Sequence, residues 1–270
     1  MNENAVKYLI LRSAPGFGNI SVNRLIRLCG SVDVCFDADE RDILSRDVKM
    51  PETERIGQKK LRAFLAYRDS DSAVNDAKNL IEKAISVGCG IITIEDIAYP
   101  KRFREICDMP TVLFVRGELR INEYERSVGI VGARRCSQEG KEEAIRRAEL
   151  EVTAASAVVS GMAKGIDSYA HTAVIKNGGY TIAVLGSGPD ICYPSEHEKL
   201  YGEIIKNGCI VSEYPPGTLP RNYTFPARNR LIAALSDKLL VIDAGPHSGT
   251  ESTVRAAGRY GRRVEYTYKS

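Results

Sequence analysis

Apolar residues in the first third of the chain recur at the three- and four-residue spacing of amphipathic helices. Glycine and proline turns separate these groups, and one of them, Ala14–Gly18, is similar to the turn of helix-hairpin-helix DNA-backbone binders. Glycine and proline also punctuate most plain interhelical turns, so both interpretations stay open. Residues 1–88 are therefore predicted to form a small helical domain of the SAM-like or helix-hairpin-helix-like kind. Its helical groups begin near Tyr8, Val22, Leu61 and Val74.

The apolar pattern changes after a connector at residues 89–126, which contains two runs of strand length at 90–94 and 111–117. From residue 127 onward, short β-branched runs alternate with helix-length amphipathic segments. The predicted strands are 128–131, 157–160, 181–185, 209–212, 239–243 and 263–266. Such alternation is typical of a parallel sheet with helices on both faces. Residues 127–270 are therefore predicted to form an α/β domain with a doubly wound, Rossmann-like sheet.

The loops that follow the strands are the candidate site, because ligands of a doubly wound sheet bind outside the carboxyl ends of its strands. Four of these loops combine glycines and hydroxyl side chains with a helix start, and two of them add basic residues. Helix N-termini offer free amides and partial positive charge to an anion. Glycine is also common in such turns for steric reasons, so one loop alone is weak evidence for a phosphate site. The prediction depends on four such loops meeting at one edge of the sheet. The candidate phosphate-binding residues are Gly132, Arg134, Arg135, Ser137, Ser160, Gly161, Lys164, Gly165, Ser248, Gly249 and Thr250.

The segment 224–233 carries the most specific binding signal. Arg228 and Arg230 are expected at the start of a helix, where a cation opposes the helix dipole unless an anion lies nearby. Phe225 precedes them, and single-stranded nucleic acids stack bases on aromatic rings while arginines meet their phosphates. We therefore predict a single-stranded nucleic-acid contact here. The alternative is a core phenylalanine beside a solvated helix face.

Composition and motifs exclude several classes of function. The net charge of +3 is too weak to indicate a nucleic-acid binder by itself, so any polyanion site must be local. The sequence has neither a dinucleotide-binding G-x-G-x-x-G loop nor a Walker A motif, and it has no G-x-S-x-G nucleophile elbow. Its seven cysteines contain no C-x-x-C pair, which favours reduced, mostly buried thiols. We predict no cofactor, no metal site and no catalytic residue.

Candidate acid–base residues have simpler structural interpretations. The three histidines lack metal-ligand spacing, and His171 is expected to pack beneath the 160–167 loop, while His247 lies in another loop. Asp167 is suited to a helix N-cap. Glu213 and Asp243 follow two strands, where they could pair as catalytic carboxylates or satisfy neighbouring amides. With no signal peptide and no apolar run of membrane-spanning length, we expect a cytoplasmic protein without a membrane partner.

An ordered set of motifs resembles the DprA (Smf) family of DNA-processing proteins over about residues 99–264. The motifs are Gly132–Ser137, Ser160–Asp167, Thr181–Pro194, Ser212–Gly217, Phe225–Ala233 and Ser248–Thr250. The resemblance implies an extended Rossmann domain, with the connector as part of it, and a helical N-terminal domain. It also implies non-catalytic binding of incoming single-stranded DNA, its protection, and loading of RecA during natural transformation or recombination, usually by homodimers. Carried over to this sequence, the pocket residues are Arg134 or Arg135, Ser137, Ser160, Gly161, Lys164, Arg228, Asn229 and Arg230.

Two departures from the family pattern lie at the end of the printed sequence. It stops at Ser270, where family members usually continue with one more helix and often a winged-helix domain, and this bears on homodimerisation and RecA loading. The segment 265–269 is unlike the usual last strand, so we expect a frayed end. The principal alternative function is a nucleotide-binding or nucleotide-processing enzyme, because the 247–251 loop resembles that of lysine-decarboxylase-like phosphoribohydrolases. A third alternative is an interaction module whose DNA site has decayed.

Overall fold

The computed structural model describes residues 3–245 and 248–268. Its N-terminal part is helical, as the apolar spacing predicts, and it contains two short helices, α3 and α4, that the spacing did not reveal. Side-chain caps explain where these begin: Ser31 accepts a hydrogen bond from the Val34 amide at the start of α3, and Asp39 accepts one from Asp42 at the start of α4. The elements are α1 (Glu3–Ser13), α2 (Asn19–Cys29), α3 (Val32–Asp37), α4 (Glu40–Asp47), η1 (Glu52–Glu54), α5 (Gln58–Arg68) and α6 (Asp71–Ser86).

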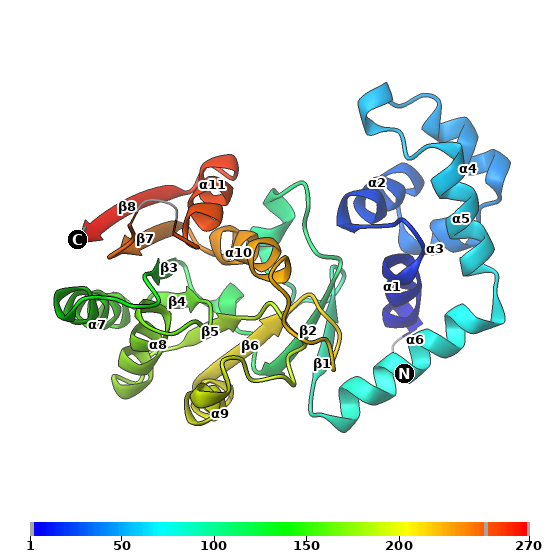
Figure 1. Cartoon of the computed structure of the whole chain (residues 1–270). Coiled ribbons are helices and arrows are strands. Elements are labelled where there is room, and N and C mark those ends of the chain that lie inside the picture. Colours follow the sequence, from blue (N-terminus) through cyan, green and yellow to red (C-terminus); the bar gives the residue numbers. More distant parts are fainter. Residues whose placement is uncertain (1–2, 246–247, 269–270) are drawn as a thin grey trace.

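The rest of the described chain forms one eight-stranded sheet in the order β1-β2-β6-β5-β4-β3-β7-β8 (Figure 1). The six strands from β3 to β8 pair in parallel, whereas β1 and β2 pair antiparallel at one end. The region from residue 90 to residue 117 therefore extends the same sheet. The strands are β1 (Gly90–Thr93), β2 (Val112–Gly117), β3 (Ser127–Gly132), β4 (Ala157–Ser160), β5 (Thr181–Val184), β6 (Gly208–Ser212), β7 (Lys238–Ile242) and β8 (Arg263–Tyr268).

Helices cover both faces of the sheet, which confirms the doubly wound α/β fold. Neighbouring strand residues point to opposite faces: Ile130 joins the apolar cluster under α7 and α8, and Val131 joins the cluster under α10 and α11. A third cluster lies under α9. The helices and short 3₁₀ turns are η2 (Lys101–Glu105), η3 (Ile121–Glu123), α7 (Gln138–Thr153), α8 (Ile166–Lys176), η4 (Ser195–His197), α9 (Glu198–Asn207), α10 (Thr224–Leu235) and α11 (Glu251–Arg259).

Three local expectations were wrong. Helix α10 begins at Thr224, so Arg228 lies in its second turn; Pro226 is accommodated because first-turn amides need no intrahelical acceptor. Gly165, not Asp167, is the N-cap of α8, and Asp167 is buried within its first turn. The frayed end expected at 265–269 is not seen at residues 265–268, because β8 pairs there in parallel with β7, with one irregularity; Lys269 lies outside the described residues.

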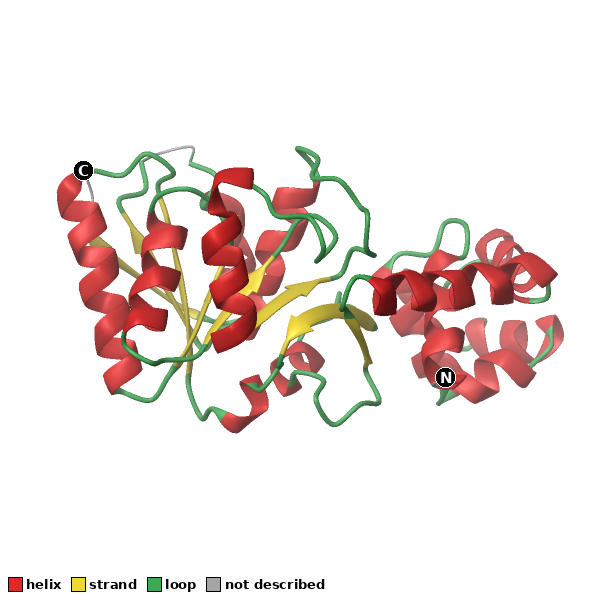
Figure 2. Cartoon of the chain, turned by 90° about the horizontal axis from the view of Figure 1, so that it is seen from below, coloured by secondary structure: helices red, strands yellow, loops and turns green. Residues whose placement is uncertain are grey.

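The helical N-terminal region packs against the β1 end of the sheet, at the opposite end from the C-terminus (Figure 2). Its buried side chains, Leu9 and Phe64 among them, belong to the same continuous apolar cluster as Phe114 of β2 and Val211 of β6. The Tyr8 hydroxyl also donates to Glu95 over 2.8 Å. Within the described residues, no helix combines the length and the apolar character needed to cross a bilayer.

Candidate functional site

An open groove of about 650 Å³ lies at the carboxyl ends of β3 and β7, beside α10. It brings together residues from segments that are far apart in the sequence, as the parallel sheet requires. Tyr193 and Asp167 also belong to its walls. The predicted site residues that line this groove are Gly132, Arg134, Arg135, Phe225, Arg228, Asn229, Ser248, Gly249 and Thr250. His247, which the sequence places in the same loop as Ser248, lies outside the described residues.

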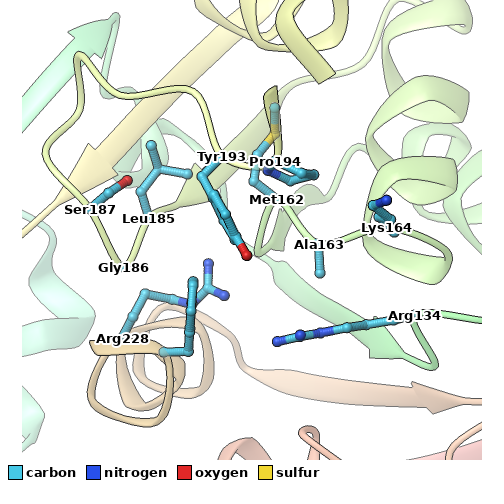
Figure 3. A pocket seen from close by; sticks show the side chains of 11 residues that line it. Arg134, Met162, Ala163, Lys164, Leu185, Gly186, Ser187, Tyr193, Pro194 and Arg228 are labelled. Carbon is cyan, nitrogen blue, oxygen red and sulfur yellow. The ribbon is translucent and has the colours of Figure 1, made fainter. Parts of the chain in front are cut away.

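A smaller pocket of about 110 Å³ adjoins the groove and shares Arg134, Tyr193, Phe225 and Arg228 with it (Figure 3). Lys164 lines this pocket. Its other walls are largely apolar and come from the loops after β4 and β5. They are Met162, Leu185, Gly186, Ser187 and Pro194, together with Ala163, which also lines the groove. The combination of apolar walls with arginine side chains suits a ligand that has a flat apolar part and a negative charge.

Arg228 is the buried cation of this site. One of its Nη atoms donates to the Val184 carbonyl, and its Nε donates to Asn229 Oδ1 over 2.9 Å. Burial lowers the pKa of Arg228 to about 10, while the nearby Asp167 carboxylate opposes that shift. Burial also raises the pKa of Asp167 to about 6, against the attraction of Arg228. Gly161 lies against both groups: a Cβ there would come within 2.5 Å of Asp167 Oδ2 and 2.9 Å of an Arg228 nitrogen.

Aromatic rings and an exposed arginine meet at the mouth of the pocket. The Arg134 guanidinium lies 5.8 Å from the centroid of the Phe225 ring, within the range of a cation–π contact. The Tyr193 ring packs on Phe225 with a centroid separation of 5.5 Å and a tilt of 32°. Tyr193 is 46% exposed, which leaves part of its ring open to a ligand. It was missed as a site residue because it lies nine residues beyond the end of β5, although it belongs to the 181–194 motif.

Lys164 has an ion-pair partner. Its Nζ lies 2.5 Å from Glu196 Oε1, and both side chains are 56% exposed. An anion that binds Lys164 must therefore compete with Glu196.

Four other predicted site residues build the loops rather than line the cavities. Ser137 caps α7 by accepting from the Gly140 amide, and its own amide and hydroxyl donate to Asp243. The Ser160 hydroxyl donates to the Ile130 carbonyl. Gly165 has φ +75°, and a Cβ there would overlap the Ala133 carbonyl oxygen. Gly161 is the close-packing position beside Arg228.

Arg230, the fifth, is not brought to either cavity. Helix geometry directs residues two positions apart to nearly opposite sides, so Arg230 leaves α10 on the side away from Arg228. There it pairs with Glu213 and donates to the Asp108 carbonyl over 3.0 Å.

The candidate acid–base groups are engaged in structural contacts. His171 is fully buried beneath the 160–167 loop, as expected, with its ring nitrogens 2.6 Å from the Gly161 carbonyl and 2.7 Å from Thr181 Oγ1. Burial lowers its pKa to about 4, so it is neutral near pH 7. The Asp243 carboxylate accepts a hydrogen bond from the Ser137 amide, and the Glu213 carboxylate forms an ion pair with Arg230. The two carboxylates therefore have separate partners and do not form a pair.

The cysteines are dispersed through the fold. All seven are free thiols, of which Cys29, Cys35, Cys89 and Cys209 are buried and Cys107 is exposed. Within residues 3–245 and 248–268, no group of three or more His, Cys, Asp or Glu side chains is arranged to hold a metal ion.

Comparison with known proteins identifies the family. The sequence profile of DNA recombination-mediator protein A matches residues 90–269, two thirds of the chain. The chain belongs to the DprA (Smf) family. It is 32% identical to Protein Smf of Synechocystis over 97% of this chain and 64% of that protein. It is 41% identical to the DNA processing protein DprA of Streptococcus pneumoniae over 64% of this chain and 60% of that protein. The chain thus spans a little over six tenths of these curated relatives.

Solved DprA structures agree with this membership. The X-ray structure of DprA from Streptococcus pneumoniae superposes with a TM-score of 0.81 over 98% of this chain and 87% of that one, at 30% identity. DprA from Helicobacter pylori superposes with a TM-score of 0.60 over 65% of this chain and 80% of that one, at 32% identity. The Helicobacter pylori protein has a single-stranded DNA binding mode that was described as unique.

Proposed function

We propose that this DprA family member binds single-stranded DNA in the groove and the adjoining pocket, without catalysis. The observation that carries this proposal is the meeting of Arg134 and Arg228 with the Phe225 and Tyr193 rings. Phosphates would meet Arg134, Arg135, Lys164 and Arg228, and unpaired bases would stack on the exposed ring of Tyr193. A duplex keeps its bases stacked inside, so it cannot use the rings in this way.

Low sequence specificity and strong salt dependence follow from this arrangement. Phosphate contacts release counterions, so the logarithm of affinity falls with the logarithm of salt by about 0.7 per phosphate for single strands. Stacking on an aromatic ring tolerates every base because every base has a π face.

Wider roles are part of the same proposal. The family resemblance supports protection of incoming single-stranded DNA, RecA loading and a cytoplasmic location. A homodimer is supported by the family resemblance. A unit of residues 127–270 that carries the groove, extended by residues 89–126 and joined to a helical domain at 1–88, is the proposed division of the chain.

Fluorescence anisotropy of a labelled oligo-dT at two salt concentrations tests the binding proposal, with duplex DNA of the same length as the comparison. We expect salt-sensitive binding that prefers the single strand, and a weaker, less salt-sensitive complex for Lys164→Ala. Absence of binding by folded protein would overturn the proposal. In that case release of ribose phosphate from nucleoside monophosphates would be measured, because the alternative is a nucleotide-processing enzyme.

A further inference from the structure

A buried group of charges lies on the side of α10 that faces away from the groove. We call Arg12, Asp108, Glu213 and Arg230 the charge junction. The Glu213 carboxylate accepts hydrogen bonds from Arg230 and, over 3.1 Å, from Asn19, while its backbone carbonyl accepts from Arg12. Arg230 also donates to the Asp108 carbonyl over 3.0 Å and lies 3.7 Å from the Asp108 carboxylate.

The charge junction is well shielded from water. The Glu213 side chain is 6% exposed and the Arg230 side chain is 12% exposed. Burial lowers the pKa of Arg12, and one of its Nη atoms is buried without a hydrogen-bond partner. Two arginines and two carboxylates balance in charge, yet burying them costs more than burying apolar side chains of similar size. Such a group is better explained by the geometry that it imposes than by stability.

The charge junction connects the N-terminal helices to the helix that carries the buried cation of the groove. Arg12 comes from α1, Glu213 follows the end of β6, and Arg230 belongs to α10. The Tyr260 hydroxyl, at the end of α11, donates to Asp108 over 2.7 Å and so connects α11 to the charge junction. Arg228 lies two residues before Arg230 and lines both cavities. A shift of α10 would therefore move Arg228 relative to Arg134 and Tyr193.

We propose that Arg12, Glu213 and Arg230 are positioning residues through which the helical N-terminal region holds α10, and with it Arg228, in the place that binds single-stranded DNA. This inference rests on the proposed function. It assigns Arg230 a role without phosphate contact, whereas the sequence motif suggested direct contact. It also gives the N-terminal region a part in DNA affinity that requires no DNA contact of its own.

The slope of the logarithm of affinity against the logarithm of salt concentration distinguishes an arginine that contacts phosphate from one that only positions α10. Arg228→Ala is expected to lower both the affinity and the slope, the slope by about 0.7 for one lost phosphate contact. Arg230→Ala and Arg12→Ala are expected to lower the affinity about tenfold, as small misplacements of binding groups do, with the slope unchanged. Arg230→Lys should behave like Arg230→Ala, because an ammonium cannot span Glu213 and the Asp108 carbonyl as the guanidinium fork does. A lysine in direct phosphate contact would instead keep both the slope and most of the affinity.

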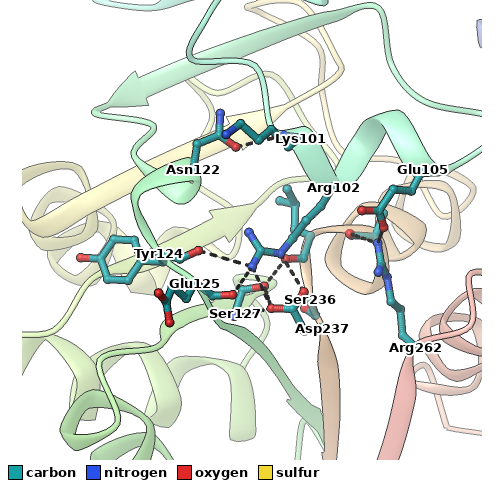
Figure 4. A network of polar contacts seen from close by, with 12 residues as sticks. Lys101, Arg102, Glu105, Asn122, Tyr124, Glu125, Ser127, Ser236, Asp237 and Arg262 are labelled. Atoms are coloured by element: carbon teal, nitrogen blue, oxygen red, sulfur yellow. Dashed lines mark hydrogen bonds and ion pairs between the residues drawn. The ribbon is translucent and has the colours of Figure 1, made fainter.

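A matched control is available at the opposite ends of the strands. The Arg102 side chain is 13% exposed and pairs with Asp237 over 2.8 Å. It also donates a hydrogen bond to the backbone carbonyl of Glu125, two residues before β3 (Figure 4). Asp237 directly precedes β7, so this pair lies at the amino ends of strands whose carboxyl ends form the groove. Arg102→Ala removes a comparable arginine, and we expect lower thermal stability with unchanged affinity. This variant shows what loss of stability alone does to binding.

Each outcome supports or overturns one of the two roles. If the wild-type protein fails to bind oligo-dT, the proposed function fails and the positioning role falls with it. If the wild type binds and Arg228→Ala lowers the slope, the function stands. In that case two results would overturn the positioning role alone. One is a salt slope that Arg230→Ala lowers as well, and the other is wild-type affinity in both Arg230→Ala and Arg12→Ala. Equal losses in Arg102→Ala would also overturn it, because general destabilisation would then explain the effect.

Discussion

Asp167 gives the proposed DNA site a dependence on pH that one substitution should remove. Its carboxylate is buried beside Arg228, and its pKa is raised to about 6, chiefly by burial. A phosphate placed in the groove adds negative charge and raises this pKa further, so DNA binding takes up a proton between about pH 5.5 and 8. Affinity should therefore rise as the pH falls through this window.

The magnitude follows from Coulomb's law. A phosphate charge about 8 Å from the carboxylate, at an effective dielectric of about 20, costs about 2 kcal/mol, or about 1.5 pKa units. Linkage between a pKa of about 6 in the free protein and about 7.5 in the complex then gives a rise in affinity of about twentyfold between about pH 8 and pH 5.5. Arg228, which faces Asp167, stays charged over this range because its pKa is lowered only to about 10. His171 stays neutral because its pKa is lowered to about 4.

Anisotropy titrations of oligo-dT at constant ionic strength measure this effect. Asp167→Asn should bind with the higher, low-pH affinity throughout and lose the pH dependence. His197→Gln is the control, because the His197 ring lies 3.1 Å from the Met162 carbonyl beside the pocket and this substitution leaves Asp167 in place. We expect His197→Gln to keep the wild-type profile. A flat wild-type profile, or a profile retained by Asp167→Asn, would refute the reasoning.

Three further perturbations follow from the same geometry. Glu196→Gln frees Lys164 from its ion pair and should raise affinity for oligo-dT about threefold, which is the size expected for an exposed pair; an unchanged affinity would show that Lys164 meets no phosphate. Tyr193→Ala should weaken binding by about 1–3 kcal/mol with the salt slope retained, whereas Tyr193→Phe keeps the ring and should bind normally. Gly165→Ala should lower the free energy of unfolding by more than about 1 kcal/mol in urea titrations, because φ is +75° and the Cβ meets the Ala133 carbonyl, while Gly178→Ala adds the φ strain without that overlap and should cost less.

The free energy of unfolding of the unliganded protein should also depend on the protonation of Asp167, and it should fall as the pH rises. A carboxyl whose folded pKa lies at about 6, above its ordinary 3.8, stabilises the fold in its protonated form, and this contribution is lost as the pH rises through about 6. The full difference is about 3 kcal/mol, from about 1.36 kcal/mol per unit. Thermal melts of wild type and Asp167→Asn across this range measure it, and parallel melting curves would contradict it.

The strands were predictable from run length and residue type rather than from periodicity. Strands such as Ala157–Ser160 and Thr181–Val184 are buried on both faces, so polar and apolar residues do not alternate along them, but short β-branched runs bounded by turn residues favour strands over helices. Helices α3 and α4 were not predicted, because six and eight residues make too few turns for a helical period to be recognised. Side-chain caps decide where they begin. The parallel pairing of β8 with β7 depends on partner residues about twenty-five positions earlier in the chain, which a local sequence pattern does not record.

The site was predictable as a set of loops but not as a set of roles. Strand order decides which loops meet, so Arg134 and Ser248 could be placed at one edge from the fold alone. Which side chains enter the cavity depends on caps and close packing. Ser137 and Ser160 look like anion ligands in the sequence, yet their hydroxyls are used by Asp243 and Ile130. Tyr193 lies in the 181–194 motif but far beyond the end of its strand, and its role is visible in its contact with Phe225 and its place in the walls of both cavities.

Arg228 and Arg230 show most clearly why the sequence alone does not assign roles. A motif treats the two arginines alike, because both are cations two residues apart in one short segment. The start of α10 at Thr224 turns them to opposite sides of the helix, one toward the cavities and Asp167, the other toward Glu213. Burial then separates their chemistry: Arg228 keeps a cavity in front of it, whereas Arg230 already donates to Glu213 and Asp108. A site that needs Arg228 at its cavity must hold α10 still, and Arg230 is placed to do that.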